Sequence, residues 1–213
     1  MSDALARALA PGIVPVVVAE AAEVAAPLAE ALEAAGVATA EVTLRTSAAP
    51  EVIRRMVASS SLVVGAGTVR TAADVDAVVE AGAAYVVSPG LSRRVVERCR
   101  EHGVPVLPGV ATPTEAMAAA ELGAHLVKFF PAEANGGVGA LRALSAALPG
   151  SRFVPTGGIT AASLRHYLEI PEVVACGGSW MVTPQLLDTG AFDVVRRLSL
   201  EAVAVARVAR GTR

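Results

Sequence analysis

The sequence predicts a (β/α)8 barrel, the TIM-barrel fold, preceded by a short helix. Eight short runs rich in β-branched residues alternate with stretches rich in Ala, Leu, Glu and Arg at helical spacing. The runs are hydrophobic on both faces, as expected for parallel strands covered by helices. Eight units in 213 residues take about 27 residues each, which is compact for a fold that typically has ~250. A doubly wound open sheet is the structural alternative.

The predicted elements follow one another in a regular order. The strands are residues 13–18, 39–44, 62–65, 85–87, 104–107, 125–130, 152–154 and 173–176, each a short run of mainly apolar or β-branched residues. The stretches between them carry apolar residues at helical spacing. The corresponding helices are residues 21–35, 49–58, 72–81, 92–102, 114–122, 138–148 and 161–168, with a short helix at 3–9 before the first strand and a long one at 192–209.

Turn-forming residues follow several of the predicted strands. They are Ser88-Pro89-Gly90, Pro108-Gly109, Phe130-Pro131 and Pro155-Thr156-Gly157-Gly158. Proline cannot donate to a strand ladder, and glycine allows another group to approach the backbone closely. In a barrel these positions form the C-terminal rim, where active sites are built. The alternative for some of these residues is that they only form ordinary turns and belong to no site.

Composition restricts the class of protein. Hydrophobic residues make up 54% of the chain, charged residues 18%, and the net charge is −2, which excludes a disordered chain. This charge and only 3% aromatic residues argue against nucleic acid or an anionic membrane surface as partner. The longest uncharged stretch, residues 173–187, is shorter than the ~20 residues that span a membrane. No linker divides the chain, so residues 1–213 are expected to form a single barrel domain.

The cysteines and histidines lack a metal-binding pattern. Cys99 and Cys176 are far apart, and His102, His125 and His166 fall in separate units, so we expect no metal site and read the histidines as surface or packing residues. Two distant cysteines fit a reduced, cytoplasmic protein. No phosphate-binding P-loop or dinucleotide signature follows a strand, and the sequence indicates no cofactor.

One basic residue differs from all the others. The 18 basic residues are arginines with the exception of Lys128, which lies in the apolar run 126–130. Strand alternation puts Leu126, Lys128 and Phe130 on one face, and Val127 and Phe129 on the other. A lysine that extends from a strand end into water is the ordinary alternative. Apolar neighbours on both sides favour a partly dry pocket, where desolvation favours a neutral amine that can attack a ketone to form a Schiff base.

The second predicted strand supplies a carboxylate for proton transfer. Alternation puts Glu41, Thr43 and Arg45 on one face, with successive residues about 6.6 Å apart. A carboxylate beside an amine and a carbonyl suits general acid/base catalysis, and Arg45 offers a bidentate fork for a carboxylate. A structural Glu41–Arg45 ion pair is the alternative. The end of the third strand, at residues 65–69, adds glycines and the hydroxyl of Thr68, which is a weak signal by itself.

Two glycine pairs follow the seventh and eighth predicted strands. They are Gly157-Gly158 and Gly177-Gly178, and each precedes a possible helix start. Free backbone N–H groups and a helix dipole at such positions attract an anion. Barrels commonly bind phosphate with the loops after strands seven and eight, so the two pairs together indicate a phosphate site.

Six motifs, in order between residues 13 and 182, closely resemble bacterial 2-keto-3-deoxy-6-phosphogluconate (KDPG) aldolases. They are Glu-Val-Thr-Leu-Arg-Thr (41–46), Gly-Ala-Gly-Thr-Val (65–69), Ser-Pro-Gly (88–90), Lys-Phe-Phe-Pro-Ala-Glu-Ala-Asn-Gly-Gly (128–137), Pro-Thr-Gly-Gly-Ile (155–159) and Gly-Gly-Ser-Trp (177–180). The resemblance implies a class I aldolase of the Entner–Doudoroff pathway, typically homotrimeric. The implied reaction cleaves KDPG to pyruvate and D-glyceraldehyde 3-phosphate without metal or cofactor.

The resemblance also implies roles for individual residues. Lys128 would be the Schiff-base lysine and Glu41 the general acid/base. Arg45 and Thr68 would hold the carboxylate of pyruvate. The phosphate site would be lined by Gly157, Gly158, Gly178 and Ser179, and the pocket wall would be shaped by Pro89, Phe130 and Thr156. Glu133 and Asn135 belong to the motif at 128–137 but receive no role.

Three alternative functions stay open at the level of sequence. A 4-hydroxy-2-oxoglutarate (KHG) aldolase and a 2-keto-3-deoxy-6-phosphogalactonate aldolase would share the chemistry, and the segment 44–46 is expected to favour the gluconate type. A catalytically silent barrel that binds a phosphorylated ligand would need neither Lys128 nor Glu41. The presence of both residues therefore favours an enzyme.

Overall fold

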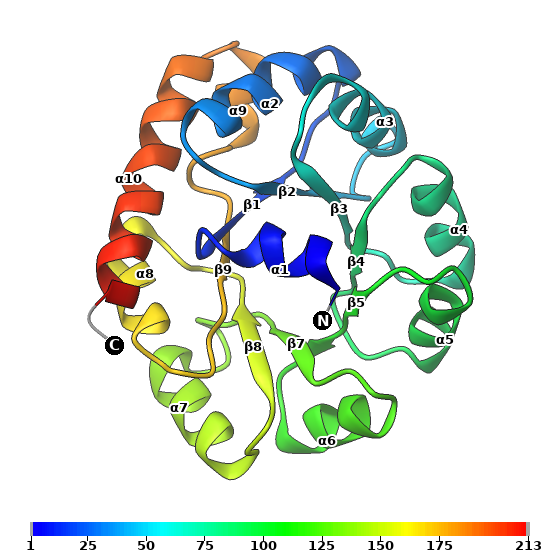
Figure 1. Cartoon of the computed structure of the whole chain (residues 1–213), viewed down its shortest axis with the longest axis vertical. Helices are drawn as coiled ribbons and strands as arrows, with labels where there is room; N and C mark the ends of the chain where they lie inside the picture. Colours follow the sequence, from blue (N-terminus) through cyan, green and yellow to red (C-terminus); the bar gives the residue numbers. More distant parts are fainter. Residues whose placement is uncertain (1, 212–213) are drawn as a thin grey trace.

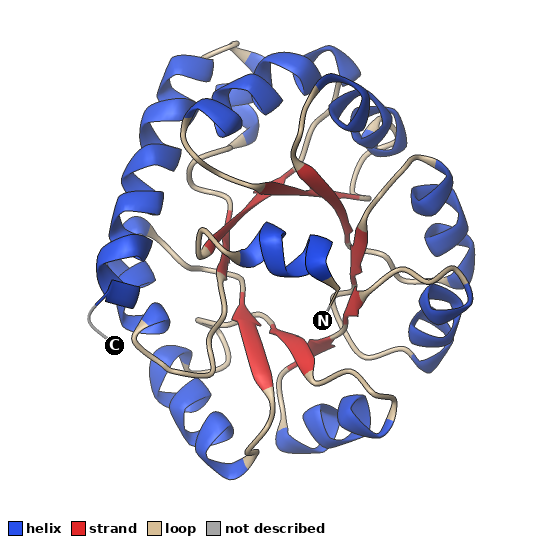
Figure 2. Ribbon diagram, in the orientation of Figure 1, coloured by secondary structure: helices blue, strands red, loops and turns tan. Residues whose placement is uncertain are grey.

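The computed structural model describes residues 2–211, which form a (β/α)8 barrel (Figure 1). The strands are β1 (Ile13–Val17), β2 (Thr39–Thr43), β3 (Val63–Gly67), β4 (Tyr85–Val87), β5 (Val106–Leu107), β6 (Gly109–Val110), β7 (Leu126–Phe129), β8 (Arg152–Pro155) and β9 (Cys176–Gly178). Figure 2 shows the strands as an inner ring with helices around it. The barrel predicted from the alternation of elements is confirmed.

The strands pair in parallel around the ring. One sheet has the order β5-β4-β3-β2-β1-β9, and the other has the order β6-β7-β8. Bridges from Phe153 to Val173 and from Thr156 to Gly177 connect β8 with the segment of β9. Because β9 also pairs with β1, the last strand lies beside the first, as a closed barrel requires.

The fifth strand differs from the prediction at 104–107, because Pro108 divides it in two. β5 pairs with β4, whereas β6 pairs with β7. Pro108 has no N–H to donate to a ladder, and its carbonyl accepts a 2.9 Å hydrogen bond from the backbone N–H of Lys128. Gly109 permits the close passage of the neighbouring chain, since a Cβ there would lie 2.2 Å from the carbonyl oxygen of Pro89.

The helices cover the outside of the barrel, with one exception, α1. The helices are α1 (Asp3–Leu9), α2 (Ala25–Ala34), α3 (Ala49–Ser59), α4 (Ala72–Glu80), α5 (Arg93–Glu101), α6 (Pro113–Glu121), α7 (Gly137–Ala147), α8 (Ala161–Leu168), α9 (Pro184–Asp188) and α10 (Phe192–Gly211). The helix predicted at 21–35 begins with a separate 3₁₀ turn, Ala22–Val24. The short helix α9 was not predicted, although Thr183 caps it and Pro184 takes its first position.

Two apolar layers stabilise the barrel. The outer layer, between strands and helices, contains outward-facing strand residues such as Val42, Val127 and Phe129. The inner layer lies within the barrel and includes Tyr85 and Leu107, with Leu5 and Leu9 of α1 packed against them. Figure 1 shows α1 lying across the end of the ring. Because α1 packs at the N-terminal ends of the strands, the opposite end, where the functional residues were predicted, is the one left for a site.

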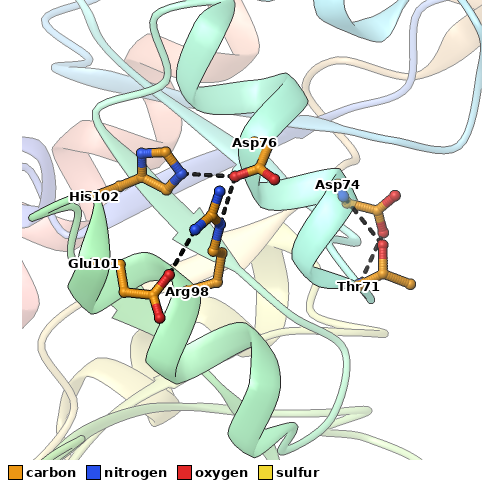
Figure 3. Close-up of polar contacts among 6 residues, drawn as sticks. All are labelled: Thr71, Asp74, Asp76, Arg98, Glu101 and His102. Carbon is orange, nitrogen blue, oxygen red and sulfur yellow. Dashed lines mark hydrogen bonds and ion pairs between the residues drawn. The ribbon is translucent and has the colours of Figure 1, made fainter.

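A surface cluster joins α4 to α5 (Figure 3). Oδ1 of Asp76 lies 2.7 Å from both Nε of Arg98 and Nε2 of His102, and Arg98 also pairs with Glu101 at 2.6 Å. The hydrogen bond from Arg98, and secondly that from His102, lowers the pKa of Asp76. His102 is therefore a surface residue paired with a carboxylate, as the sequence indicated. In Figure 3, Thr71 and Asp74 form the capping box that begins α4.

Both cysteines lie in the buried core. Cys99 and Cys176 are free and buried, and burial raises the pKa of the Cys99 thiol to about 12. Within residues 2–211, no helix is both long and apolar enough to cross a membrane.

Gly65 provides a test of how tightly the barrel interior is packed. A Cβ at this position would lie 2.1 Å from the ring of Tyr85, which is buried and cannot swing into solvent. We expect Gly65→Ala to lower the free energy of unfolding by about 1–3 kcal/mol, because overpacking forces neighbouring groups to move. Chemical denaturation of both proteins measures the change.

Gly139→Ala is the matched control for this substitution. Gly139 lies in α7 with nothing within 4 Å of the added Cβ, so the free energy of unfolding should stay unchanged or rise slightly. Equal losses in the two variants would contradict tight packing around Gly65.

Candidate active site

Lys128 lies inside the barrel, near the C-terminal end of β7. Its side chain is buried, with 6% of the residue exposed, while its neighbours Val127 and Phe129 face the outer layer. The amine Nζ donates a 3.0 Å hydrogen bond to Oε1 of Glu41, 87 residues away in the chain. It also lies 5.1 Å from the centre of the Phe130 ring. The alternation predicted for this strand is confirmed, and the lysine does not extend into solvent.

Glu41 reaches Lys128 from β2, and glycines of β3 leave the space for it. The residue is 3% exposed. Gly65 lies beside Glu41 in the strand register, and a Cβ at Gly67 would lie 2.2 Å from Oε1 of Glu41. Any side chain at position 67 would therefore displace the carboxylate. The structural alternative of a Glu41–Arg45 ion pair is wrong, because Glu41 pairs with Lys128.

Tyr85 lies close to this pair and was missed by the sequence analysis. Its ring occupies the space over Gly65, and its hydroxyl lies 2.8 Å from Oγ1 of Thr39. Burial, and secondly the charge of Glu41, raises the pKa of the Tyr85 phenol. The Thr39 hydroxyl donates onward to the carbonyl of Val63 at 2.5 Å. A neutral, hydrogen-bonded phenol thus lies within the electrostatic field of the carboxylate.

A cavity of about 270 Å³ opens at the C-terminal end of the barrel. Seven of the predicted site residues line it, namely Arg45, Phe130, Thr156, Gly157, Gly158, Gly178 and Ser179. Glu41 and Lys128 are not part of its lining. Since Phe130 lines the cavity and lies against Lys128, the buried pair is adjacent to the cavity. Among residues 2–211, the guanidinium of Arg45 has no carboxylate partner, so the cavity has a free positive charge at its edge.

Thr68 and Pro89 lie outside the lining of this cavity but at the same end of the barrel. Thr68 follows β3 directly, next to the glycine that contacts Glu41, and has a left-handed backbone with φ of 59°. Such a conformation is uncommon for a threonine and marks a constrained position. The carbonyl of Pro89 packs against Gly109, which pairs with Lys128 in the strand register.

The two glycine pairs differ from each other in structure. Gly157 and Gly158 form a true loop after β8, with φ of 101° and 79°, and α8 follows with Thr160 as its cap. Gly177 and Gly178 instead lie within β9, which corrects the strand predicted at 173–176. Their missing side chains leave room for Thr156 and for the ring of Trp180. Only the first pair stands directly before a capped helix, α8.

The side chains at this site suit covalent and acid/base catalysis. Within residues 2–211, no three His, Cys, Asp or Glu side chains gather as a possible metal site. The buried pair beside the cavity supplies an amine and a carboxylate 3.0 Å from it, and the cavity lining supplies a free guanidinium and a loop of backbone N–H groups. An amine next to a proton carrier can form and hydrolyse an imine, and the remaining groups can hold anions.

Comparisons with known proteins agree with this arrangement. Residues 6–198 match the family described as "Aldolase: KDPG and KHG aldolase". The chain is 45% identical over 197 residues to the 2-dehydro-3-deoxy-phosphogluconate aldolase of Treponema pallidum, covering 92% of this chain and 94% of that protein.

Two solved structures are similar over nearly the whole chain. The KDPG aldolase of Zymomonas mobilis with 3-phosphoglycerate has a TM-score of 0.88 at 40% identity, covering 95% of this chain and 96% of that one. The KDPG aldolase of Legionella pneumophila, with pyruvate captured as a covalent carbinolamine intermediate, has a TM-score of 0.89 at 35% identity, covering 95% and 98%. The chain therefore belongs to the family of KDPG and KHG aldolases.

Proposed function

We propose that this protein is a class I aldolase that cleaves KDPG to pyruvate and D-glyceraldehyde 3-phosphate, in the Entner–Doudoroff pathway. The contact between the Lys128 amine and the Glu41 carboxylate, beside a cavity with a free arginine and a glycine loop, carries this proposal. The names of the relatives favour KDPG over the other keto acids considered. A silent ligand-binding barrel would have no use for an amine and a carboxylate buried in contact.

The reaction begins with formation of an imine. The amine of Lys128 attacks the C2 ketone of KDPG and forms a carbinolamine. Glu41, with Oε1 3.0 Å from Nζ, carries protons between the nitrogen and the C2 oxygen so that water can leave. The product is a protonated imine on Lys128. The positive charge of this imine withdraws electrons from the C3–C4 bond. The proposed reaction therefore includes no metal or cofactor.

Cleavage follows from the electron demand of the imine. Glu41, directly or through a water, takes the proton from the C4 hydroxyl. The C3–C4 bond breaks, its electron pair moves into the C2–C3 bond, and the nitrogen becomes neutral in an enamine. D-Glyceraldehyde 3-phosphate is released as the aldehyde. Protonation at C3 and addition of water then free pyruvate and restore the amine.

The remaining predicted residues bind the two ends of the substrate in this proposal. Arg45 and Thr68 hold the carboxylate next to C2, for which a bidentate guanidinium is well suited. The phosphate lies against the backbone of Gly157, Gly158, Gly178 and Ser179. Pro89, Phe130 and Thr156 form the walls around the reacting carbons. Support comes from the lining of the cavity, which includes most of these residues.

We further propose that residues 1–213 form one domain, that the protein is a homotrimer, and that it works in the cytoplasm. The family resemblance implies the trimer. Exposed apolar side chains on α6 and α10, Met117 and Leu200 among them, are available for an interface.

The covalent step can be tested by trapping. Incubation with pyruvate and sodium borohydride should reduce the imine to a stable adduct on Lys128, located by peptide mass mapping. Lys128→Arg should give no adduct and no turnover, because a guanidinium stays protonated and is a poor nucleophile. Since the chain has no other lysine, the N-terminus is the only competing amine. A wild-type adduct elsewhere, or none, would exclude the proposed chemistry.

Glu41→Gln separates proton transfer from amine chemistry. The glutamine retains the size of the side chain but cannot accept a proton, so turnover of KDPG should fall by about 10²–10⁴-fold. The borohydride adduct on Lys128 should still form, more slowly. Stopped-flow measurement of pyruvate release, with thermal unfolding as a fold control, checks the expectation. Turnover equal to wild type would remove Glu41 from its proposed role.

The oligomeric state is open to direct measurement. Light scattering on a gel-filtration column should give three times the chain mass of 21.5 kDa at micromolar concentration. A single-chain mass that persists as concentration rises would contradict the trimer but would leave the catalytic proposal intact.

A further inference from the structure

We infer that Glu133 is a positioning residue: it holds the glycine loop (residues 157–158) in the shape that receives the substrate phosphate. The inference rests on the proposed function, which assigns the phosphate to this loop. Glu133 belongs to the motif at 128–137, and none of the roles described above uses it.

Main-chain hydrogen bonds place Glu133 beside the glycine loop. The N–H of Ala132 donates to the carbonyl of Thr156 at 2.8 Å, and the N–H of Glu133 donates to the carbonyl of Gly157 at 3.0 Å. These bonds continue the pairing of β7 with β8 beyond the ends of the strands. Glu133 is therefore aligned with the loop by the same register that places Lys128 in the site.

The stem of Glu133 packs against the backbone of the loop. A Cβ at Gly158 would lie 2.7 Å from both Cβ and Cγ of Glu133, so only glycine leaves room for this side chain. Gly158 also has a φ of 79°, in the left-handed region. The loop conformation and the Glu133 side chain thus fit each other.

Tyr167 fixes the far end of the Glu133 side chain. Its hydroxyl donates a 2.7 Å hydrogen bond to Oε1 of Glu133. Tyr167 lies on α8, the helix that the glycine loop enters, and it is buried, so its hydroxyl needs a partner. Burial, and secondly this hydrogen bond, raises the pKa of Tyr167. The other oxygen, Oε2, would lie 3.3 Å from a Cβ at Gly137, close to the first turn of α7, where a helix dipole favours a negative charge.

These contacts therefore hold the glycine loop from two sides. The loop leads from β8 into α8, and Tyr167 of α8 binds Glu133, which packs against Gly158 of the loop. A loop fixed in this way loses little conformational freedom when it binds an anion, and preorganisation of this kind raises affinity. Glu133 would act on the phosphate end alone, through the loop, while the amine chemistry at Lys128 continues without it.

Substrate pairs with and without phosphate test the inference. Steady-state constants are measured for KDPG and for 2-keto-3-deoxygluconate, which lacks the phosphate, with wild type, Glu133→Ala, Glu133→Gln and Tyr167→Phe. Glu133→Ala should raise KM for KDPG about tenfold with kcat nearly unchanged, a loss confined to binding. kcat/KM for the unphosphorylated acid should stay within about twofold of wild type. The amide of Glu133→Gln keeps an acceptor for Tyr167 and should restore most of the discrimination.

The control variant changes the same helix, α8, at its other end. Glu169→Ala removes an exposed carboxylate from the end of the same helix, away from the loop, and should leave both substrates unaffected. If Glu133→Ala is too unstable to assay, Tyr167→Phe, which deletes one hydroxyl, should still raise KM for KDPG selectively. Equal losses for both substrates, or an unchanged KM for KDPG, would overturn the positioning role. A wild-type enzyme that does not prefer KDPG over the unphosphorylated acid would instead contradict the proposed function.

Discussion

The site depends on one contact, the 3.0 Å hydrogen bond between the amine of Lys128 and the carboxylate of Glu41. Both groups are buried, and a buried charge without a partner is strongly destabilising. The barrel makes the contact possible because β2 and β7 point side chains toward a common axis from different parts of the ring. Gly67 then leaves free the space that the Glu41 carboxylate occupies, because a Cβ there would lie 2.2 Å from its Oε1. The pairing of β9 with β1 closes the ring that holds both strands.

Much of the architecture follows from patterns that are local in sequence. Alternation along residues 126–130 correctly predicted that Lys128 faces inward with Leu126 while Val127 faces the helices. Alternation of strands with helical stretches correctly predicted the barrel. The same reasoning ended the third strand at Gly65 and the eighth at Cys176, because glycine has low strand propensity, and yet Gly67, Gly177 and Gly178 also lie within strands. In these positions the neighbours' side chains, not the residue's own preference, determine the structure.

Features that depend on register between strands could not be predicted from the sequence. The packing of the Tyr85 ring against Gly65, and the division of the fifth strand at Pro108, both require knowledge of which residue lies opposite which. The same limit applies to the contact of Glu133 with Gly158, which joins segments 25 residues apart. The sequence indicated that the glycine-rich strand ends leave space for another group. Which neighbouring side chains fill that space followed only from the fold. The sequence therefore predicted the functional residues of the site but not the residues that pack against them.

The position of α1 has a consequence for the order of events in turnover. With this helix and the inner apolar layer filling one end of the ring, the cavity at the other end is the opening that substrate, water and both products share. On the proposed route pyruvate is still bonded to Lys128 when the carbon chain is cut. The phosphorylated aldehyde is the first product to leave, and addition of water to the imine then frees the second product. The covalent bond to Lys128 and the shared opening therefore both order release, with the aldehyde leaving before pyruvate.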